Sequence, residues 1–266
     1  MYKLVAIDID DTLLTDDHRI TEGTKEALKR ASERGVLVTL ATGRMHASAK
    51  DIAAQLGMNV PLISYQGALV RNLQDDSILY ERNLSRPIAE SIFAYAAEHG
   101  LHLQAYYDDQ LIVPVDNDKV RAYAKLSAIP YTVDPDFAKY AALPMTKLLI
   151  IDEPDVLDEH IPVLKQQLGA EAHITKSKPN FLEFMHPEGT KGNALRFLAE
   201  HHCGCTLAET IGIGDSWNDL DLVELAGLGV AMGNAVDPLK LVADIVTLTN
   251  NEEGVRHIVE TYILQA

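Results

Sequence analysis

The sequence contains 266 residues with a formal net charge of −16, and 47% of the residues are hydrophobic. This length suits two domains of ordinary size, and the apolar fraction is sufficient for buried cores. A chain this acidic repels the phosphates of nucleic acids and the surfaces of anionic membranes, so we expect neither as a partner. An anionic ligand would therefore need a local site made of a metal ion, a basic side chain or backbone N–H groups.

The two cysteines, Cys203 and Cys205, are too few for a disulfide framework and favour a reducing compartment. Met1 is followed almost directly by an apolar strand-like segment, without the pattern of a signal peptide. No apolar run of the sequence reaches the roughly 18 residues that a membrane-spanning helix needs. We expect a cytoplasmic protein, with a monomer as the default state.

The first part of the chain alternates strand and helix patterns. Short apolar runs indicate buried strands, and stretches bounded by capping residues and glycines indicate helices. The expected order is strand 4–10, helix 24–31, strand 36–41, helix 46–56 and strand 61–65. Such alternation predicts a parallel sheet covered by helices.

The same pattern returns near the end of the chain. We expect strand 210–214, helix 220–225, strands 229–232 and 245–248, and a final helix 252–263. His201 to Cys205 holds two histidines and two cysteines, but its spacing fits no zinc pattern and indicates a helix end followed by a turn.

The middle of the chain has a mixed α+β pattern with antiparallel character. It predicts a helix opened by Ser85 and ended by Gly100, a hairpin over 103–113, a strand 147–151, a helix 155–168, and strands 173–176 and 181–184. We therefore predict an α/β fold with a Rossmann-like, doubly wound parallel sheet, formed by residues 1–82 and 189–266. Residues 83–188 would be an inserted α+β domain.

Polar residues gather where the predicted parallel strands end, which is where such sheets bind ligands. Asp8 and Asp10 are two residues apart, so a strand would place both acids on one side. Two acids leaving an apolar strand are unfavourable unless a cation or hydrogen bonds hold them, and carboxylates suit Mg²⁺. One acid could then act as a nucleophile and the other as a general acid and base.

Three further strand or helix ends carry suitable groups. Thr42-Gly43-Arg44 offers a hydroxyl and backbone N–H groups that could hold an oxyanion. Lys191 falls in the first turn of a predicted helix, where a cation is unfavourable without an anionic partner. Asp215 and Asp219 are four residues apart, so one helical turn can bring them together. Each feature alone also fits an ordinary turn, cap or surface group, and their shared location is the stronger signal.

With these motifs the sequence resembles the haloacid dehalogenase superfamily, within it the Cof-like subfamily with a C2-type α+β cap. The four motifs of that family match Asp8, Asp10 and Thr12; Thr42 with Gly43 and Arg44; Lys191; and Gly214, Asp215, Asn218 and Asp219. The resemblance covers essentially the whole chain. It implies a phosphatase that hydrolyses small organic phosphate monoesters such as sugar phosphates, nucleotides, flavin mononucleotide or pyridoxal phosphate.

The resemblance also implies roles for single residues. Asp8 would form a phospho-aspartate, and Asp10 would act as general acid and base. Mg²⁺ would be bound by Asp8, the backbone carbonyl of Asp10 and Asp215. Phosphoryl oxygens would be held by Thr42, Lys191, Asn218 and the Gly43 N–H. Thr12, Arg44 and Asp219 would support the site, Asp219 by orienting Lys191 or a metal-bound water.

Two positions depart from the family pattern, and the cap is less readable. Asp11 stands where many members have glycine, and Gln66 stands where asparagine is usual. Cap residues that could contact substrate are Tyr106, Tyr107, Asn180 and His186. A phosphomutase or phosphotransferase, a receiver-type signalling module and a non-catalytic phosphate-binding protein are the competing interpretations.

Overall fold

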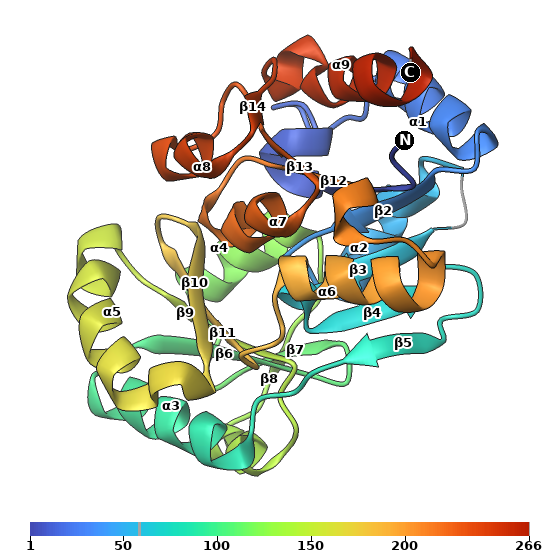
Figure 1. Cartoon of the computed structure of the whole chain (residues 1–266). Coiled ribbons are helices and arrows are strands. Elements are labelled where there is room, and N and C mark those ends of the chain that lie inside the picture. Colours follow the sequence, from blue (N-terminus) through green and yellow to red (C-terminus); the bar gives the residue numbers. More distant parts are fainter. Residues whose placement is uncertain (58–59, 266) are drawn as a thin grey trace.

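A computed structural model describes residues 1–57 and 60–265. The chain forms two β-sheets, each with its own helices, and Figure 1 shows them one above the other with both chain ends on the upper unit. The strands of the lower sheet all lie between His102 and Met185. This arrangement is the α/β architecture with an inserted α+β unit that the sequence predicts. The exact domain boundaries at 82/83 and 188/189 stay a prediction.

The larger sheet has eight strands in the order β14-β13-β12-β1-β2-β3-β4-β5. Their bounds are β1 Leu4–Asp8, β2 Leu37–Ala41, β3 Pro61–Ser64, β4 Leu69–Asn72, β5 Ile78–Glu81, β12 Thr210–Gly214, β13 Leu228–Ala231 and β14 Ile245–Val246. The strands from β14 to β3 run parallel, and β4 and β5 add an antiparallel hairpin at one edge. The core strands were predicted from their apolar runs, and this hairpin was not.

Helices cover both faces of the larger sheet, as Figure 1 shows. They are α1 Glu22–Glu33, α2 His46–Ala54, α6 Lys191–Phe197, α7 Leu220–Leu225, α8 Asp237–Val242 and α9 Gly254–Val259. Alternate residues of β1 point to opposite faces: Val5 and Ile7 pack with α1, α2 and α9, whereas Leu4 and Ala6 pack with α6. The central strand is therefore buried on both sides, which explains its continuous apolar run.

The inserted unit is built on a six-stranded sheet in the order β10-β11-β9-β6-β7-β8. Its strands are β6 His102–Tyr107, β7 Gln110–Val113, β8 Thr132–Val133, β9 Lys147–Ile151, β10 His173–Lys178 and β11 Phe181–Met185. Neighbouring strands are antiparallel except β7 and β8. The predicted antiparallel character is confirmed.

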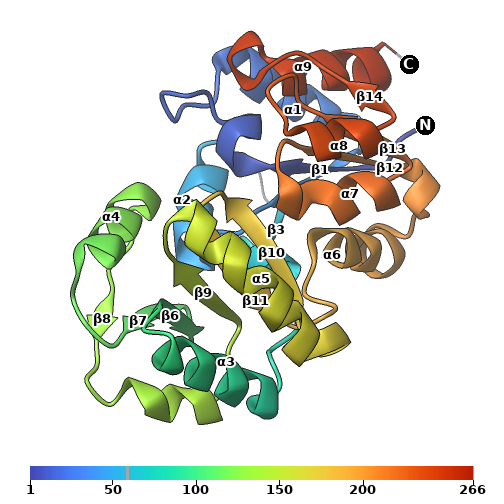
Figure 2. The ribbon, with the colours of Figure 1, turned by 90° about the vertical axis from the view of Figure 1, so that its left-hand side faces the viewer.

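Three helices belong to this unit: α3 Arg86–Glu98, α4 Asp118–Ser127 and α5 Pro154–Leu168. Helices α3 and α5 pack on one face of the sheet. The other face packs on α4 and on Tyr65 and Leu69 of the larger unit. In Figure 2, α4 lies beside α2. The inserted unit therefore lies over one end of the parallel sheet.

Several short turns of 3₁₀ or π type complete the chain, at 9–13, 65–67, 137–142, 169–171, 198–203, 207–209, 217–219, 250–252 and 260–264. The first of them corrects the predicted strand 4–10. Strand β1 ends at Asp8, and Asp11 then adopts a left-handed conformation with φ of 59°. No helix within the described ranges is long and apolar enough to cross a membrane.

Candidate active site

The site lies at the carboxyl ends of three adjacent parallel strands. Strand β1 pairs with β12 on one side and β2 on the other. Asp8 ends β1, Thr42 follows β2, and Asp215 follows β12. Because parallel strands end at the same edge of a sheet, three segments distant in sequence meet there.

Lys191 occupies the centre of this edge and is fully buried. It is the first residue of α6, whose N-cap Thr190 accepts a hydrogen bond from the Asn193 N–H. The Lys191 ammonium donates to Asp8 Oδ1, and to Asp219 Oδ1 at 2.6 Å. Burial alone would lower the pKa of Lys191, but the two carboxylates outweigh it and the pKa is raised.

The two acids nearest the cleft are held in an environment that disfavours their charge. Burial raises the pKa of Asp8 well above its usual value, and the attraction of Lys191 does not compensate. Burial, followed by repulsion from Asp219, raises the pKa of Asp215 to about 7. Asp215 accepts one hydrogen bond, from the Thr12 hydroxyl at 2.8 Å. A nearby cation would favour the ionised form of both acids.

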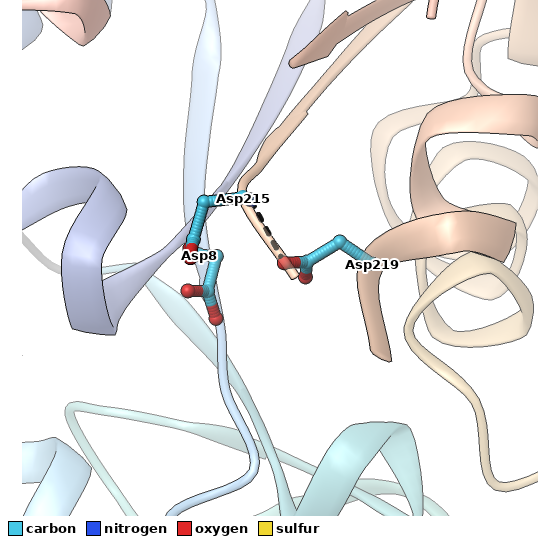
Figure 3. A group of neighbouring side chains, drawn as sticks. All are labelled: Asp8, Asp215 and Asp219. Atoms are coloured by element: carbon cyan, nitrogen blue, oxygen red, sulfur yellow. Dashed lines mark hydrogen bonds between the residues drawn. The ribbon is translucent and has the colours of Figure 1, made fainter. Parts of the chain in front are cut away.

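Asp219 supports the other groups and is itself fully buried. Its Oδ2 accepts the backbone N–H groups of Asp215 at 3.0 Å and Ser216 at 3.1 Å, while Oδ1 accepts Lys191. Figure 3 shows its carboxylate reaching toward the Asp215 backbone from the opposite side of the cluster. A Cβ atom at Gly214 would lie 2.4 Å from the Asp219 Cγ, so this approach requires glycine.

The three acids form a cluster that could hold a metal ion. Asp8, Asp215 and Asp219 each offer an oxygen, and these oxygens lie within 4.8 Å of one another (Figure 3). One lysine balances three buried carboxylates, which leaves negative charge that a cation would neutralise. Both oxygens of Asp219 accept hydrogen bonds, whereas Asp8 and Asp215 each keep one oxygen without a donor among the described residues. The donor set fits a hard divalent cation, with Asp8 and Asp215 as its better ligands.

Asp10 follows the end of β1 and lines the same cleft as Asp8. Its carboxylate accepts two hydrogen bonds from Arg44, at 2.6 and 2.7 Å. Burial alone would raise the pKa of Asp10, but the Arg44 hydrogen bonds and charge outweigh it and lower the pKa. Arg44 also donates to Ser48, which in turn donates to the backbone carbonyl of Ser127 in the inserted unit.

The Thr42-Gly43 segment is held tightly between the two units. Thr42 is buried, and its hydroxyl accepts the Arg44 N–H at 3.1 Å. The Gly43 carbonyl accepts a hydrogen bond from Lys147 of β9 at 2.7 Å. A Cβ atom at Gly43 would lie 2.3 Å from Gln66 Nε2, so the absence of a side chain lets Gln66 pack against this segment.

A cleft opens between the two units above these groups. The larger unit lines it with Asp8, Asp10, Asp11, Thr42, Gly43, Arg44, Asp215, Ser216 and Asn218. The inserted unit lines it with Tyr123, Leu126, Ser127, Ser177, Lys178, Phe181 and Glu183.

The structure thus brings the predicted motif residues to one place, with Thr12, Lys191 and Asp219 behind the cleft wall. The cap residues singled out from sequence fare differently. Tyr106 is buried and packs edge-to-face on Tyr65, and Asn180 lines a neighbouring hollow. Neither these two nor Tyr107 and His186 are among the residues that line the cleft in the described part of the chain.

Other residues of the cleft were missed from sequence. Tyr123 lies on α4, a helix that was not predicted. Glu183 carried a usable signal, because it is an acid inside the apolar run of the predicted strand 181–184. The His201–Cys205 segment ends a helical turn at Gly204, with φ of 64°, as predicted.

Comparison with known proteins agrees with this geometry. A family profile described as haloacid dehalogenase-like hydrolase matches residues 5–259. The HMP-PP phosphatase of Cronobacter sakazakii is 31% identical over 239 residues, which cover 90% of this chain and 87% of that protein.

Solved structures match over nearly the whole length. The crystal structure of TM0651 from Thermotoga maritima is 35% identical, with a TM-score of 0.84, and covers 98% of this chain and 97% of that one. A haloacid dehalogenase-like hydrolase from Bacteroides thetaiotaomicron is 31% identical, with a TM-score of 0.86, and covers 98% of this chain and 99% of that one. The chain therefore belongs to the haloacid dehalogenase-like hydrolase family and is a phosphatase of its Cof-like branch, with an α+β cap.

Proposed function

We propose that the protein hydrolyses small phosphate monoesters with Mg²⁺ through a phospho-aspartate on Asp8. The observation that carries this proposal is the setting of Asp8. It is buried at the floor of the cleft and fixed by Lys191, and within residues 1–57 and 60–265 one of its carboxylate oxygens accepts no hydrogen bond. A carboxylate held in this way can act as a nucleophile toward phosphorus.

The remaining motif residues would divide the work of the two half-reactions. Asp8 forms a bond to phosphorus while the bond to the ester oxygen breaks, and Asp10 gives that oxygen a proton. Water then attacks the phospho-aspartate, Asp10 takes a proton from it, and Asp8 and phosphate are released. The Arg44 contact keeps Asp10 ionised before substrate binds, so proton delivery requires a weaker contact with Arg44 in the complex.

Mg²⁺ would be bound by Asp8, Asp215 and the backbone carbonyl of Asp10. When bound, the ion offsets the repulsion between the carboxylates and the incoming phosphate. Thr42, Lys191, Asn218 and the Gly43 N–H would hold the phosphoryl oxygens, where charge is spread in the transition state.

A small phosphorylated metabolite is the substrate class that fits. Side chains of the cap, for which we retain the boundaries 83–188, line the cleft together with those of the larger unit. Relatives are named as phosphatases of HMP-PP and of 5-amino-6-(5-phospho-D-ribitylamino)uracil. A sugar phosphate, a nucleotide, flavin mononucleotide or a pyridoxal phosphate-like compound remains within the proposal. A cytoplasmic monomer without nucleic-acid or membrane partners completes it.

A phosphomutase or phosphotransferase would use the same nucleophile and pass the phosphoryl group to a hydroxyl other than water. A binding protein without activity is disfavoured because Asp8, Asp10, Lys191 and Asp215 are all present and grouped. A receiver module is disfavoured by the large cap.

Phosphate release from a panel of small esters tests the proposal. We expect release by the wild type with Mg²⁺, none with EDTA, and a loss of at least about a thousandfold in Asp8→Asn. Glu171→Gln, an exposed acid of the cap, is the matched control and should keep wild-type rates. No release from any ester by folded, Mg²⁺-loaded protein would favour the mutase or binding alternatives.

A further inference from the structure

A series of hydrogen-bonded polar side chains runs from the cap to the proposed phosphate site. It begins at Glu183 of β11, passes through Gln66 in the turn after β3, and ends at Asn218 beside the acidic cluster. Gln66 Nε2 donates to Glu183 Oε2, and Asn218 Nδ2 donates to Gln66 Oε1 at 2.9 Å. Glu183 is 2% exposed and Gln66 is 1% exposed. The bond between Gln66 and Glu183 is therefore shielded from water, and the bond between Asn218 and Gln66 is partly buried.

The chemistry of the three side chains fixes which group donates and which accepts in each hydrogen bond of the series. An ionised carboxylate only accepts hydrogen bonds, so Gln66 must turn its NH₂ group toward Glu183. Its carbonyl oxygen then faces Asn218, which must donate a hydrogen bond to it from its own NH₂ group. One hydrogen of Asn218 Nδ2 is thereby anchored, and the amide plane is set. Asn218 Oδ1 stays buried without a protein partner among the described residues.

Glu183 is itself held by charged and polar neighbours of the cap. The Ser177 hydroxyl donates to its Oε1 at 2.7 Å, and the buried Lys147 ammonium lies 3.6 Å from the same atom. Lys147 also donates to the Gly43 carbonyl at 2.7 Å. Lys147 of the cap thus contacts Gly43 directly, whereas Glu183 reaches Asn218 through Gln66.

The backbone conformation of Gln66 holds its side chain in this bridging position. It has φ of 61°, in the left-handed region that non-glycine residues rarely adopt, and its N–H donates to the Thr42 carbonyl at 2.9 Å. The open space at Gly43 accommodates its side chain. Asparagine, one methylene shorter, would not span the same two partners from this backbone.

We propose that Glu183 and Gln66 are positioning residues, which orient the Asn218 amide for the phosphoryl group without touching the reacting atoms. This proposal rests on the proposed phosphatase function. It makes the cap a part of the phosphate site as well as a cover over it. The alternative is that Glu183, which also lines the cleft, contacts the leaving group directly.

A polarity swap separates the two possibilities. Glu183→Gln alone replaces one of the two acceptor oxygens by an NH₂ group, so position 183 no longer dictates which way the Gln66 amide points. Gln66→Glu alone places two carboxylates against each other. In the double variant Gln66→Glu/Glu183→Gln, the new amide at 183 donates to the new carboxylate at 66. That carboxylate still accepts from Asn218, so the orientation of Asn218 is restored. The carboxylate now stands at position 66 and no longer at position 183.

The experiment measures kcat and KM for p-nitrophenyl phosphate, glucose 6-phosphate and flavin mononucleotide. We expect each single variant to lose roughly ten- to a hundredfold in kcat, by the same factor for every ester hydrolysed, because misplaced supporting groups typically have effects of this size. The double variant should recover to within about threefold of wild type. Glu171→Gln should not change kcat, and thermal melts identify any variant that fails to fold.

Losses that differ among esters by more than about tenfold, with no recovery in the double variant, would overturn the proposal in favour of a leaving-group contact. If the wild type hydrolyses none of the esters, the proposed function fails separately. The positioning role is then read from the thermal shift that orthovanadate with Mg²⁺ induces. That shift should shrink in the single variants and return in the double variant; no shift in the wild type, or no return, contradicts the role.

Discussion

Lys191 at the start of α6 and Asp8 at the end of β1 meet as a charged pair from which solvent is excluded. Asp219 completes the arrangement on the other side of the ammonium. A lysine in the first turn of a helix opposes the helix dipole, so its placement needs these partners. The pair joins two segments 183 residues apart and fixes Asp8, the proposed nucleophile, at the floor of the cleft.

Replacement of Lys191 should affect stability as well as activity. Lys191→Met leaves two carboxylates buried without their cation, and breaking such a group typically costs about 3–5 kcal/mol. We expect a loss of this size in urea unfolding with EDTA present. Lys29→Met, on the exposed face of α1, should change stability by no more than about 0.5 kcal/mol. Equal stability of the two variants would contradict the structural role of Lys191.

Metal binding should stabilise the protein through Asp8 and Asp215. We expect Mg²⁺ to raise the melting temperature of the metal-free wild type in a concentration-dependent manner. Asp215→Asn should melt at a higher temperature than the metal-free wild type, because one buried repulsive charge is gone, and should show little response to Mg²⁺. A full response in the variant would remove Asp215 from the ligand set.

The pH dependence of stability follows from the raised pKa of Asp215. A carboxyl whose folded pKa of about 7 exceeds its ordinary value of 3.8 contributes stability at low pH that is lost as pH rises through about 7. In EDTA, wild type should therefore lose on the order of 2 kcal/mol relative to Asp215→Asn between pH 5 and pH 8. Urea unfolding of both proteins at the two pH values measures this difference. A difference that is constant or of opposite sign would refute the assignment.

Gly67 is required for the position of Lys191. It has φ of 105°, and a Cβ atom there would lie 2.2 Å from the backbone carbonyl of Thr190. Gly100 has φ of 64° but open space around its missing Cβ atom. Gly100→Ala should therefore cost only about 1 kcal/mol for backbone strain. Gly67→Ala should cost roughly 3 kcal/mol or more and reduce kcat, because α6 must shift. Chemical denaturation and steady-state rates of the two variants compare them directly.

The sequence carries enough information for the parallel sheet because buried strands must be continuously apolar. Strands β1, β2 and β12 follow this rule, so the meeting point of Asp8, Thr42 and Asp215 could be predicted. The end of β1 could not be predicted, because the apolar run continues through Ile9, which already belongs to the turn after the strand. Asp8 and Asp10 line the same cleft although β1 ends between them, and the pairing of Asp10 with Arg44 depends on tertiary contacts.

The cap side of the cleft was harder to read. The pattern of α4 is polar except for a few buried positions such as Val120 and Tyr123, so its helix was not recognised. The chain from Glu183 to Asn218 joins a strand of the cap to two turns of the larger unit. Periodicity describes single elements and cannot indicate which elements meet across a domain interface.

The most direct test of the account is the detection of phosphate on Asp8. Wild type mixed with a hydrolysed ester and Mg²⁺, then quenched in acid, should show by mass spectrometry one added phosphoryl group on the peptide that contains Asp8. Asp8→Asn should show none and should release no phosphate. Phosphate release by Asp8→Asn at the wild-type rate, or a phosphoryl group on another residue, would contradict the nucleophile assignment.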